Sequence, residues 1–146
     1  MSYKGRFIPR NPEKYAGNPT RIVYRSLWEL RVMRKFDADP NVLTWASEEV
    51  VVPYVNPLDN RVHRYFPDFL VKNRTRDDTI KITMIEVKPA SQAAPPKHCD
   101  KKSRRKYISE AVAWQINNSK WEAARRYCSE RGWTFAVLTE KSLGVG

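Results

Sequence analysis

Three β-prone segments follow one another between residues 48 and 88, and only short turns separate them. Residues 48–55 are rich in valine, residues 61–72 continue in an extended pattern that Pro67 interrupts, and residues 79–88 alternate between apolar and polar side chains. Consecutive strands with short connections usually pair side by side and antiparallel. The sequence therefore predicts a hairpin or meander in the middle of the chain.

Helical segments stand on either side of these strands. In residues 26–37 the apolar side chains recur at intervals of three and four, which is typical of a helix with one buried face, and Pro40 follows. A second helix is predicted from about residue 107 to residue 131, with Gly132 at its end, and the β-prone residues 133–139 come next. The predicted order of elements is αβββαβ.

The length of 146 residues suits one domain, and we expect residues 1–146 to form it. Residues 1–20 are rich in Pro, Gly, Asn and basic side chains, which predicts an irregular N-terminal arm exposed to solvent. Residues 89–106 contain two consecutive prolines and a dense group of cations, which predicts a long basic loop.

The charge of the chain points to a polyanionic partner. The sequence has 27 Lys and Arg residues against 16 Asp and Glu residues, a formal net charge of +11, so nucleic acid is the first candidate. No apolar run approaches the ~20 residues of a membrane-spanning helix, and we expect a soluble intracellular protein with no membrane partner and with reduced cysteines. The two cysteines and two histidines lack a chelating spacing, which argues against zinc.

The stretch MIEVKPA, residues 84–90, places a carboxylate and an ammonium group on one face of a strand. Strand side chains alternate between faces, so Glu86 and Lys88 project together, and a neighbouring strand could bring Asp68, which follows Pro67, close to Glu86. Two adjacent carboxylates repel each other unless a cation lies between them, and Mg²⁺ prefers such oxygen ligands. A bound divalent metal polarises a phosphodiester and activates water, while Lys88 would steer the attacking water, deprotonate it or stabilise transition-state charge.

The pair Pro67-Asp68, followed by Glu86-Val87-Lys88 on this order of elements, resembles the PD-(D/E)xK nuclease superfamily. Longer stretches over nearly the whole chain are similar to the TnsA-type transposon endonuclease domain and, more closely, to the head completion nucleases of contractile-tailed bacteriophages: YRSLWE at 24–29, EVVVPY at 49–54, HRYFPDF at 63–69, IEVKP at 85–89 and GWTFAVLTE at 132–140.

This resemblance implies an α/β, restriction-endonuclease-like αβββαβ core with a central mixed sheet flanked by helices. It implies a DNA endonuclease that hydrolyses phosphodiester bonds with Mg²⁺, for which Mn²⁺ could substitute. Asp68 and Glu86 would bind the metal, with Glu29 and Val87 as further metal positions. The catalytic set would be Glu29, Asp68, Glu86 and Lys88.

The resemblance also implies a role in virion assembly. The protein would act on packaged DNA or its ends before tail joining, with phage head or neck proteins as partners, in the virion or the host cytoplasm. Whether it forms a homodimer stays open. Two other functions stay open as well: a non-catalytic DNA-binding head–neck connector, and an endonuclease of transposition or repair.

Two local assignments have alternatives. Glu29 follows Ser26 by three residues, which is the spacing of a capping box at the start of a helix, so it is either a catalytic acid or a cap. The basic loop is either a solvated surface or a DNA contact, and we expect phosphate contacts. The predicted DNA-binding residues are Arg64, Lys97, Lys101, Lys102, Arg104, Arg105 and Lys106.

Overall fold

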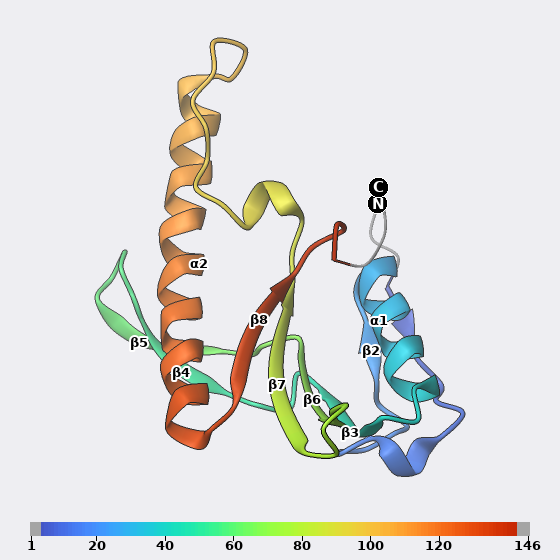
Figure 1. Cartoon of the computed structure of the whole chain (residues 1–146). Helices are drawn as coiled ribbons and strands as arrows, with labels where there is room; N and C mark the ends of the chain where they lie inside the picture. Colours follow the sequence, from blue (N-terminus) through green and yellow to red (C-terminus); the bar gives the residue numbers. More distant parts are fainter. Residues whose placement is uncertain (1–3, 143–146) are drawn as a thin grey trace.

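The computed structural model describes residues 4–142, so the first three residues of the predicted arm and the last four residues of the predicted domain lie outside it. Its centre is a four-stranded sheet in which the first three strands are antiparallel and the last pair is parallel (Figure 1). This arrangement confirms the predicted central mixed sheet. Its strands, in spatial order, are β3 (Val42–Ser47), β6 (Phe69–Arg74), β7 (Ile80–Val87) and β8 (Thr134–Leu138).

A separate hairpin accounts for the rest of the predicted meander. Strands β4 (Val52–Asn56) and β5 (Arg61–Tyr65) pair only with each other among the described strands. The extended pattern predicted over residues 61–72, with its interruption at Pro67, is therefore two strands that belong to different sheets. The chain breaks between Tyr65 and Phe69, where the buried Pro67 has no N–H to donate to a ladder.

The first strand of the main sheet was not predicted. Residues 42–47 form β3, whereas the strand predicted at residues 48–55 begins later, at Val52. The register between β3 and β6 shifts between Val42 and Thr44, so buried side chains in this strand do not alternate regularly with exposed ones. The period-two signal on which the prediction depended is absent there.

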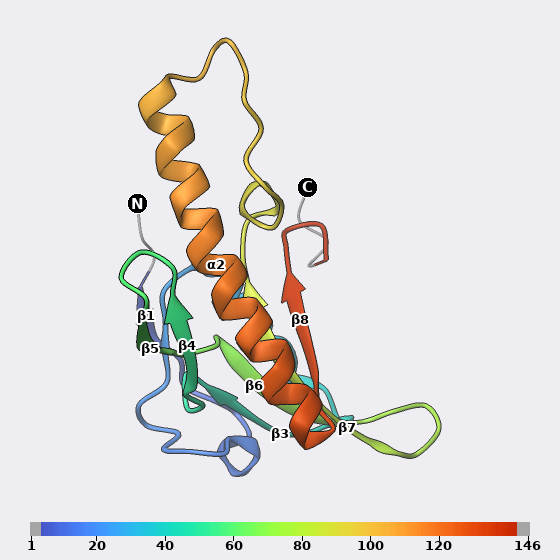
Figure 2. The ribbon, with the colours of Figure 1, turned by 90° about the vertical axis from the view of Figure 1, so that its left-hand side faces the viewer.

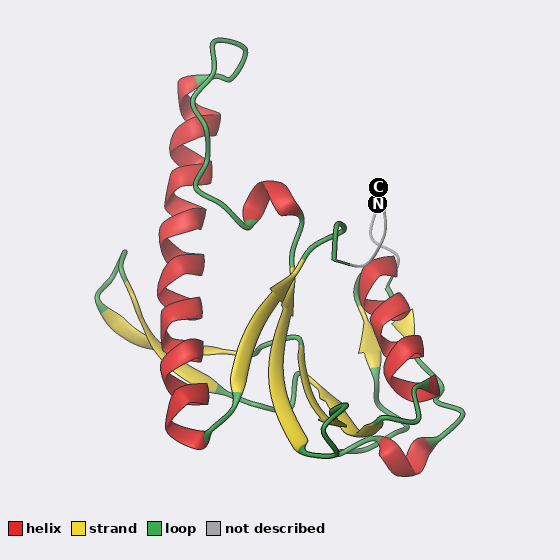
Figure 3. Ribbon diagram, viewed as in Figure 1, coloured by secondary structure: helices red, strands yellow, loops and turns green. Residues whose placement is uncertain are grey.

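The helices cover opposite faces of the main sheet, as Figures 1 and 3 show. Helix α1 (Leu27–Ala38) starts within one residue of the prediction, and its apolar face packs on one side of the sheet with Phe69, Val71 and Ile85. Helix α2 (Arg104–Arg131) packs on the other side with Met84 and the hairpin. Strand β7 thus contributes adjacent residues to two different hydrophobic clusters.

The N-terminal segment is packed against the protein, contrary to the expected solvent-exposed arm. Strand β1 (Gly5–Arg6) pairs with β2 (Val23–Tyr24), and a 3₁₀ helix, η1 (Pro12–Lys14), lies between them in the chain. The side chains of Phe7 and Tyr15 are buried around Trp45. These aromatic residues outweigh the local Pro and Gly content, because burying each removes a large apolar area from water.

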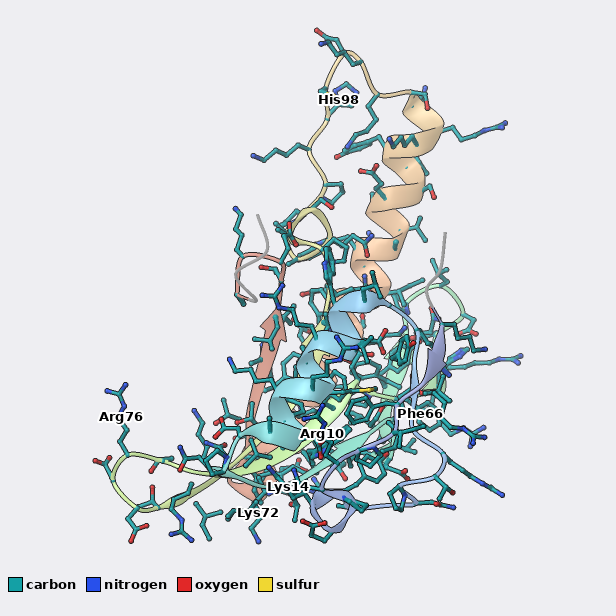
Figure 4. All side chains as sticks on the ribbon, turned by 90° about the vertical axis from the view of Figure 1, so that its right-hand side faces the viewer. Arg10, Lys14, Phe66, Lys72, Arg76 and His98 are labelled. Atoms are coloured by element: carbon teal, nitrogen blue, oxygen red, sulfur yellow. The ribbon has the colours of Figure 1, made fainter. Side chains whose placement is uncertain are left out.

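Hydrogen bonds to the end of α1 also hold this segment. The backbone N–H groups of Arg10 and Asn11 donate to the buried Asp37 carboxylate at 2.8 and 3.0 Å, and Lys14 Nζ donates to the Asp37 carbonyl at 3.1 Å. Figure 4 shows Arg10 and Lys14 beside α1. The segment is therefore part of the folded body.

The segment between the main sheet and α2 projects from the body. A second 3₁₀ helix, η2 (Ala90–Gln92), follows β7, and the loop after it extends with the outer half of α2 beyond the sheet (Figure 2). Helix α2 begins three residues before the prediction, because Ser103 caps it by accepting the Lys106 N–H at 3.1 Å. The predicted loop therefore ends at Ser103, and Gly132 ends the helix as predicted, with a φ of 72°. Within residues 4–142, no helix is both long and apolar enough to span a membrane.

Candidate active site

The pairing of β6 with β7 brings Asp68 next to Glu86. Phe69 lies opposite Ile85, so Asp68, one residue before β6, and Glu86, one residue further along β7, occupy the next level of the ladder. This cross-strand position places the two carboxyl groups side by side. Burial, and then the charge of Glu86, raise the pKa of Asp68 well above its usual range. The predicted pair of carboxylates is thus brought together by the fold.

Both carboxyl groups have fixed partners. The Val87 N–H donates to Asp68 Oδ2 at 2.7 Å, which lowers the pKa of Asp68 less than burial and Glu86 raise it. Glu86 is 6% exposed and accepts a hydrogen bond from the phenol of Tyr65 at Oε2. The backbone of Val87, predicted as a metal position, therefore orients the neighbouring ligand candidate.

The carboxylate pair fits a divalent cation. Burial and the charge of Glu86 raise the pKa of the half-buried Asp68, so a proton or another positive charge stabilises the pair. Among the described residues, no group of three or more His, Cys, Asp or Glu side chains is arranged to hold a metal ion. A site of two carboxylates suits Mg²⁺, which usually keeps several waters and takes the rest of its ligands from substrate phosphate.

Glu29 lies close to this pair but also takes part in the helix cap. Its N–H donates to Ser26 Oγ at 3.1 Å, and the Ser26 hydroxyl donates to Glu29 Oε2 at 3.2 Å. Burial raises the pKa of the Glu29 carboxyl, and the charge of Glu29 contributes to the raised pKa of Asp68. The structure therefore contains the predicted cap and places Glu29 within electrostatic reach of the carboxylate pair.

Lys88 is held at the end of β7 by the last strand. Its backbone N–H donates to the Leu138 carbonyl at 2.9 Å, which extends the pairing of β7 with β8 by one residue. Alternation along this extended backbone puts Lys88 on the same face as Glu86. In the described part of the chain the Lys88 ammonium forms no ion pair.

Two neighbours of the pair were missed from the sequence. Tyr65 belongs to the hairpin and donates a hydrogen bond to Glu86. In the sequence, its position three residues before Asp68 is the only feature that could have indicated a role at the site. Glu48 follows β3, donates its N–H to the Asp68 carbonyl at 3.1 Å and pairs with Arg25 at 3.2 Å. Its φ of 54° is left-handed and uncommon outside glycine, and no sequence pattern here announces it.

The predicted DNA-binding residues fall into two separate regions. Arg64 lies on the outer side of the hairpin, with its guanidinium 5.9 Å from the Phe66 ring centre, whereas the other six lie on the projection formed by residues 93–106. Figure 4 shows Phe66 on the body and His98 near the outer end of this projection. The two regions lie well apart.

Within the projection, the cations differ in their surroundings. Lys102 donates to the Lys97 carbonyl and to Glu110, both at 2.7 Å, and is only 16% exposed. Its charge is therefore already paired. The exposed cations of the projection are Lys97, Lys101, Arg104, Arg105 and Lys106.

Comparison with known proteins agrees with this geometry. Residues 39–140 match the family described as the TnsA-like endonuclease N-terminal domain. The chain belongs to this TnsA-like endonuclease family. The matched range includes Asp68, Glu86 and Lys88, but Glu29 precedes it. The chain is also 34% identical to the head completion nuclease of Enterobacteria phage T4, over 98% of this chain and 95% of that protein.

The protein is accordingly a nuclease of the TnsA-like family and a homologue of a phage head completion nuclease. Nucleases of the PD-(D/E)xK type, to which this family belongs, generally use a divalent metal. The mixed sheet, the helices on its two faces and the paired carboxylates are compatible with a restriction-endonuclease-like fold.

Proposed function

We propose that the protein cleaves DNA with Mg²⁺ held by Asp68 and Glu86. The placement of the half-buried Asp68 opposite the buried Glu86, on adjoining strands of a chain that belongs to an endonuclease family, carries the proposal. The bound metal would supply positive charge to the phosphate and activate water for attack on phosphorus. Mn²⁺, which also favours oxygen ligands, would substitute for Mg²⁺.

The residues around the pair have distinct tasks in this proposal. Asp68 is oriented by the Val87 N–H at Oδ2, so its other oxygen atom, Oδ1, has a fixed position. The ammonium group of Lys88, on the face of Glu86, stabilises negative charge on the phosphate in the transition state and orients the attacking water. Glu29 adds negative charge near Asp68 and is the candidate for a further acid.

The exposed cations of the projection would contact DNA phosphates. These exposed cations carry no acidic partner in the described structure, whereas Lys102 pairs with Glu110, and an unpaired group of this size favours a polyanion. Contacts to phosphates position the duplex without reading its sequence. We therefore expect weak sequence preference.

We also propose a head completion role, because the similarity to the phage T4 protein extends over nearly the full length of both chains. In this role the protein acts on packaged DNA ends together with phage head or neck proteins, in the virion or the host cytoplasm, and residues 1–146 work as one domain. A homodimer would cut both strands.

Plasmid nicking tests the catalytic proposal. Asp68→Asn and Glu86→Gln should abolish cleavage in Mg²⁺ and leave thermal unfolding cooperative, whereas Asp77→Asn, in the exposed turn between β6 and β7, should cleave like the parent protein. EDTA should stop cleavage by the parent protein, and Mn²⁺ should restore it. Cleavage by both site variants at the parental rate would rule out this site.

Supplying phage with the variants tests the biological role. If head completion requires cleavage, Asp68→Asn should fail to support tail joining although it is still recovered from filled heads. Normal tail joining with this variant would instead favour a non-catalytic connector role.

A further inference from the structure

We infer that Tyr65 is a positioning residue that holds Glu86 in the orientation needed to bind the metal beside Asp68. The inference rests on the proposed function, since it assigns Glu86 to the metal. Tyr65 ends β5 in the separate hairpin, whereas Glu86 belongs to β7 of the main sheet. Their hydrogen bond therefore connects β7 of the main sheet to the separate hairpin.

The contact between Tyr65 and Glu86 is a buried hydrogen bond with a defined direction. The phenol of Tyr65 donates to Glu86 Oε2, and the two residues are 5% and 6% exposed. A protonated phenol beside a carboxylate acts only as a donor to it.

This bond restricts the carboxylate of Glu86. With Oε2 held by the phenol, rotation about the last side-chain torsion would break a buried, charge-assisted hydrogen bond, which is about twice as strong as a neutral one. The outer partner of a metal ligand commonly fixes its orientation in this way, and its loss typically costs about 10- to 100-fold in metal affinity or activity.

Packing from α2 fixes the phenol in turn. Lys120 Nζ lies 5.7 Å from the centre of the Tyr65 ring and also 5.7 Å from the centre of the Tyr54 ring. The buried Trp121 belongs to the same hydrophobic cluster as both tyrosines. Its indole N–H approaches the Tyr65 phenol but has no hydrogen-bond partner within residues 4–142.

Tyr54 offers a matched control. It lies on the neighbouring strand of the same hairpin, is 7% exposed and has the same distance to Lys120. Its phenol makes no hydrogen bond to a carboxylate of the described chain, however. Removing the Tyr54 hydroxyl therefore changes the same environment without releasing Glu86.

The experiment compares Tyr65→Phe with Tyr54→Phe in the full chain. Binding of Mn²⁺ alone, followed by electron paramagnetic resonance, should be about 10- to 100-fold weaker in Tyr65→Phe and unchanged in Tyr54→Phe. In Mg²⁺ the kcat of DNA cleavage by Tyr65→Phe should fall, while its KM for DNA stays at the parental value. Thermal unfolding of both variants shows whether each is folded.

The outcomes separate the two levels of the proposal. Suppose that the parent protein binds Mn²⁺ and that Glu86→Gln abolishes this binding. If Tyr65→Phe then binds Mn²⁺ with the parental affinity, the positioning role is wrong and the metal site stands. Equal weakening in both tyrosine variants would show general packing and would also overturn the inference. Failure of the parent protein itself to bind Mn²⁺ would refute the metal site, and the role of Tyr65 with it.

Discussion

Replacing Asp68 with Asn should make the metal-free protein more stable while it removes a ligand from the proposed metal site. Two side chains directly opposite on antiparallel strands have Cβ atoms about 5 Å apart, and unit charges at that distance repel by about 3 kcal/mol at an effective dielectric constant of about 20. Asn has the same shape, keeps an oxygen acceptor for the Val87 N–H and adds an N–H donor toward Glu86. The repulsion is removed and the hydrogen bond is kept.

The gain should depend on pH in a defined direction. Because the pKa of Asp68 is higher in the folded protein than in the unfolded chain, the folded state binds more protons, and parental stability falls as pH rises above the unfolded pKa. The advantage of Asp68→Asn should therefore grow from about pH 4, by up to about 1.4 kcal/mol per pH unit, and level off only above about pH 9, where folded Asp68 has lost its proton. An advantage of about 3 kcal/mol along this rise corresponds to a Tm higher by about 10 °C for a chain of this size.

Thermal unfolding in EDTA, followed by circular dichroism between pH 4 and pH 8, measures the effect. Asp77→Asn, which removes an exposed carboxylate from the turn after β6, should follow the parental curve. Added Mg²⁺ should raise the Tm of the parent protein and leave that of Asp68→Asn unchanged, since only the former retains both ligands. A lower Tm for Asp68→Asn than for the parent at pH 8 would refute the repulsion between the carboxyl groups.

Three further outcomes are expected. Glu29→Gln keeps the Ser26 cap and should leave the Tm unchanged while it reduces Mg²⁺-dependent cleavage, and parental cleavage would assign Glu29 to the cap alone. Gly132→Ala should lower the free energy of unfolding by about 1 kcal/mol in denaturant, because the φ of 72° disfavours a residue with a side chain. A Cβ there would meet no atom within 4 Å, so the cost is conformational, and an unchanged denaturation midpoint would contradict it. The double change of Lys101 and Arg105 to Gln should weaken DNA binding and reduce the slope of log affinity against log salt by about 2. Lys35→Gln on α1 should leave both unchanged, and equal slopes for the double variant and the parent would exclude these phosphate contacts.

The paired carboxylates could be predicted because they depend on short-range rules. Alternation along β7 put Glu86 and Lys88 on one face, and a turn between β6 and β7 made Asp68 a neighbour of that face. The same rules failed at β3, where a register shift hides the alternation, and at the N-terminal segment, where Phe7 and Tyr15 find a core that no local pattern describes.

Tyr65 could not be recognised for a related reason. Its contact with Glu86 depends on how the two-stranded hairpin packs against the main sheet and against α2. These elements are far apart in the chain. That packing follows from the shapes of many side chains at once. The carboxylate of Glu48 is likewise positioned by a left-handed backbone conformation at this residue. The local sequence Glu48-Glu49 gives no sign of that conformation.

The pairing of Lys88 with Leu138 has a consequence for biosynthesis. The strand that carries both Glu86 and Lys88 is complete only when a parallel neighbour, fifty residues later in the chain, takes its place beside it. When the ribosome has released the chain up to the end of α2, every candidate catalytic side chain is already present. The backbone N–H of Lys88, however, still lacks its hydrogen bond to Leu138. We therefore expect nascent protein to lack nuclease activity until translation has passed β8.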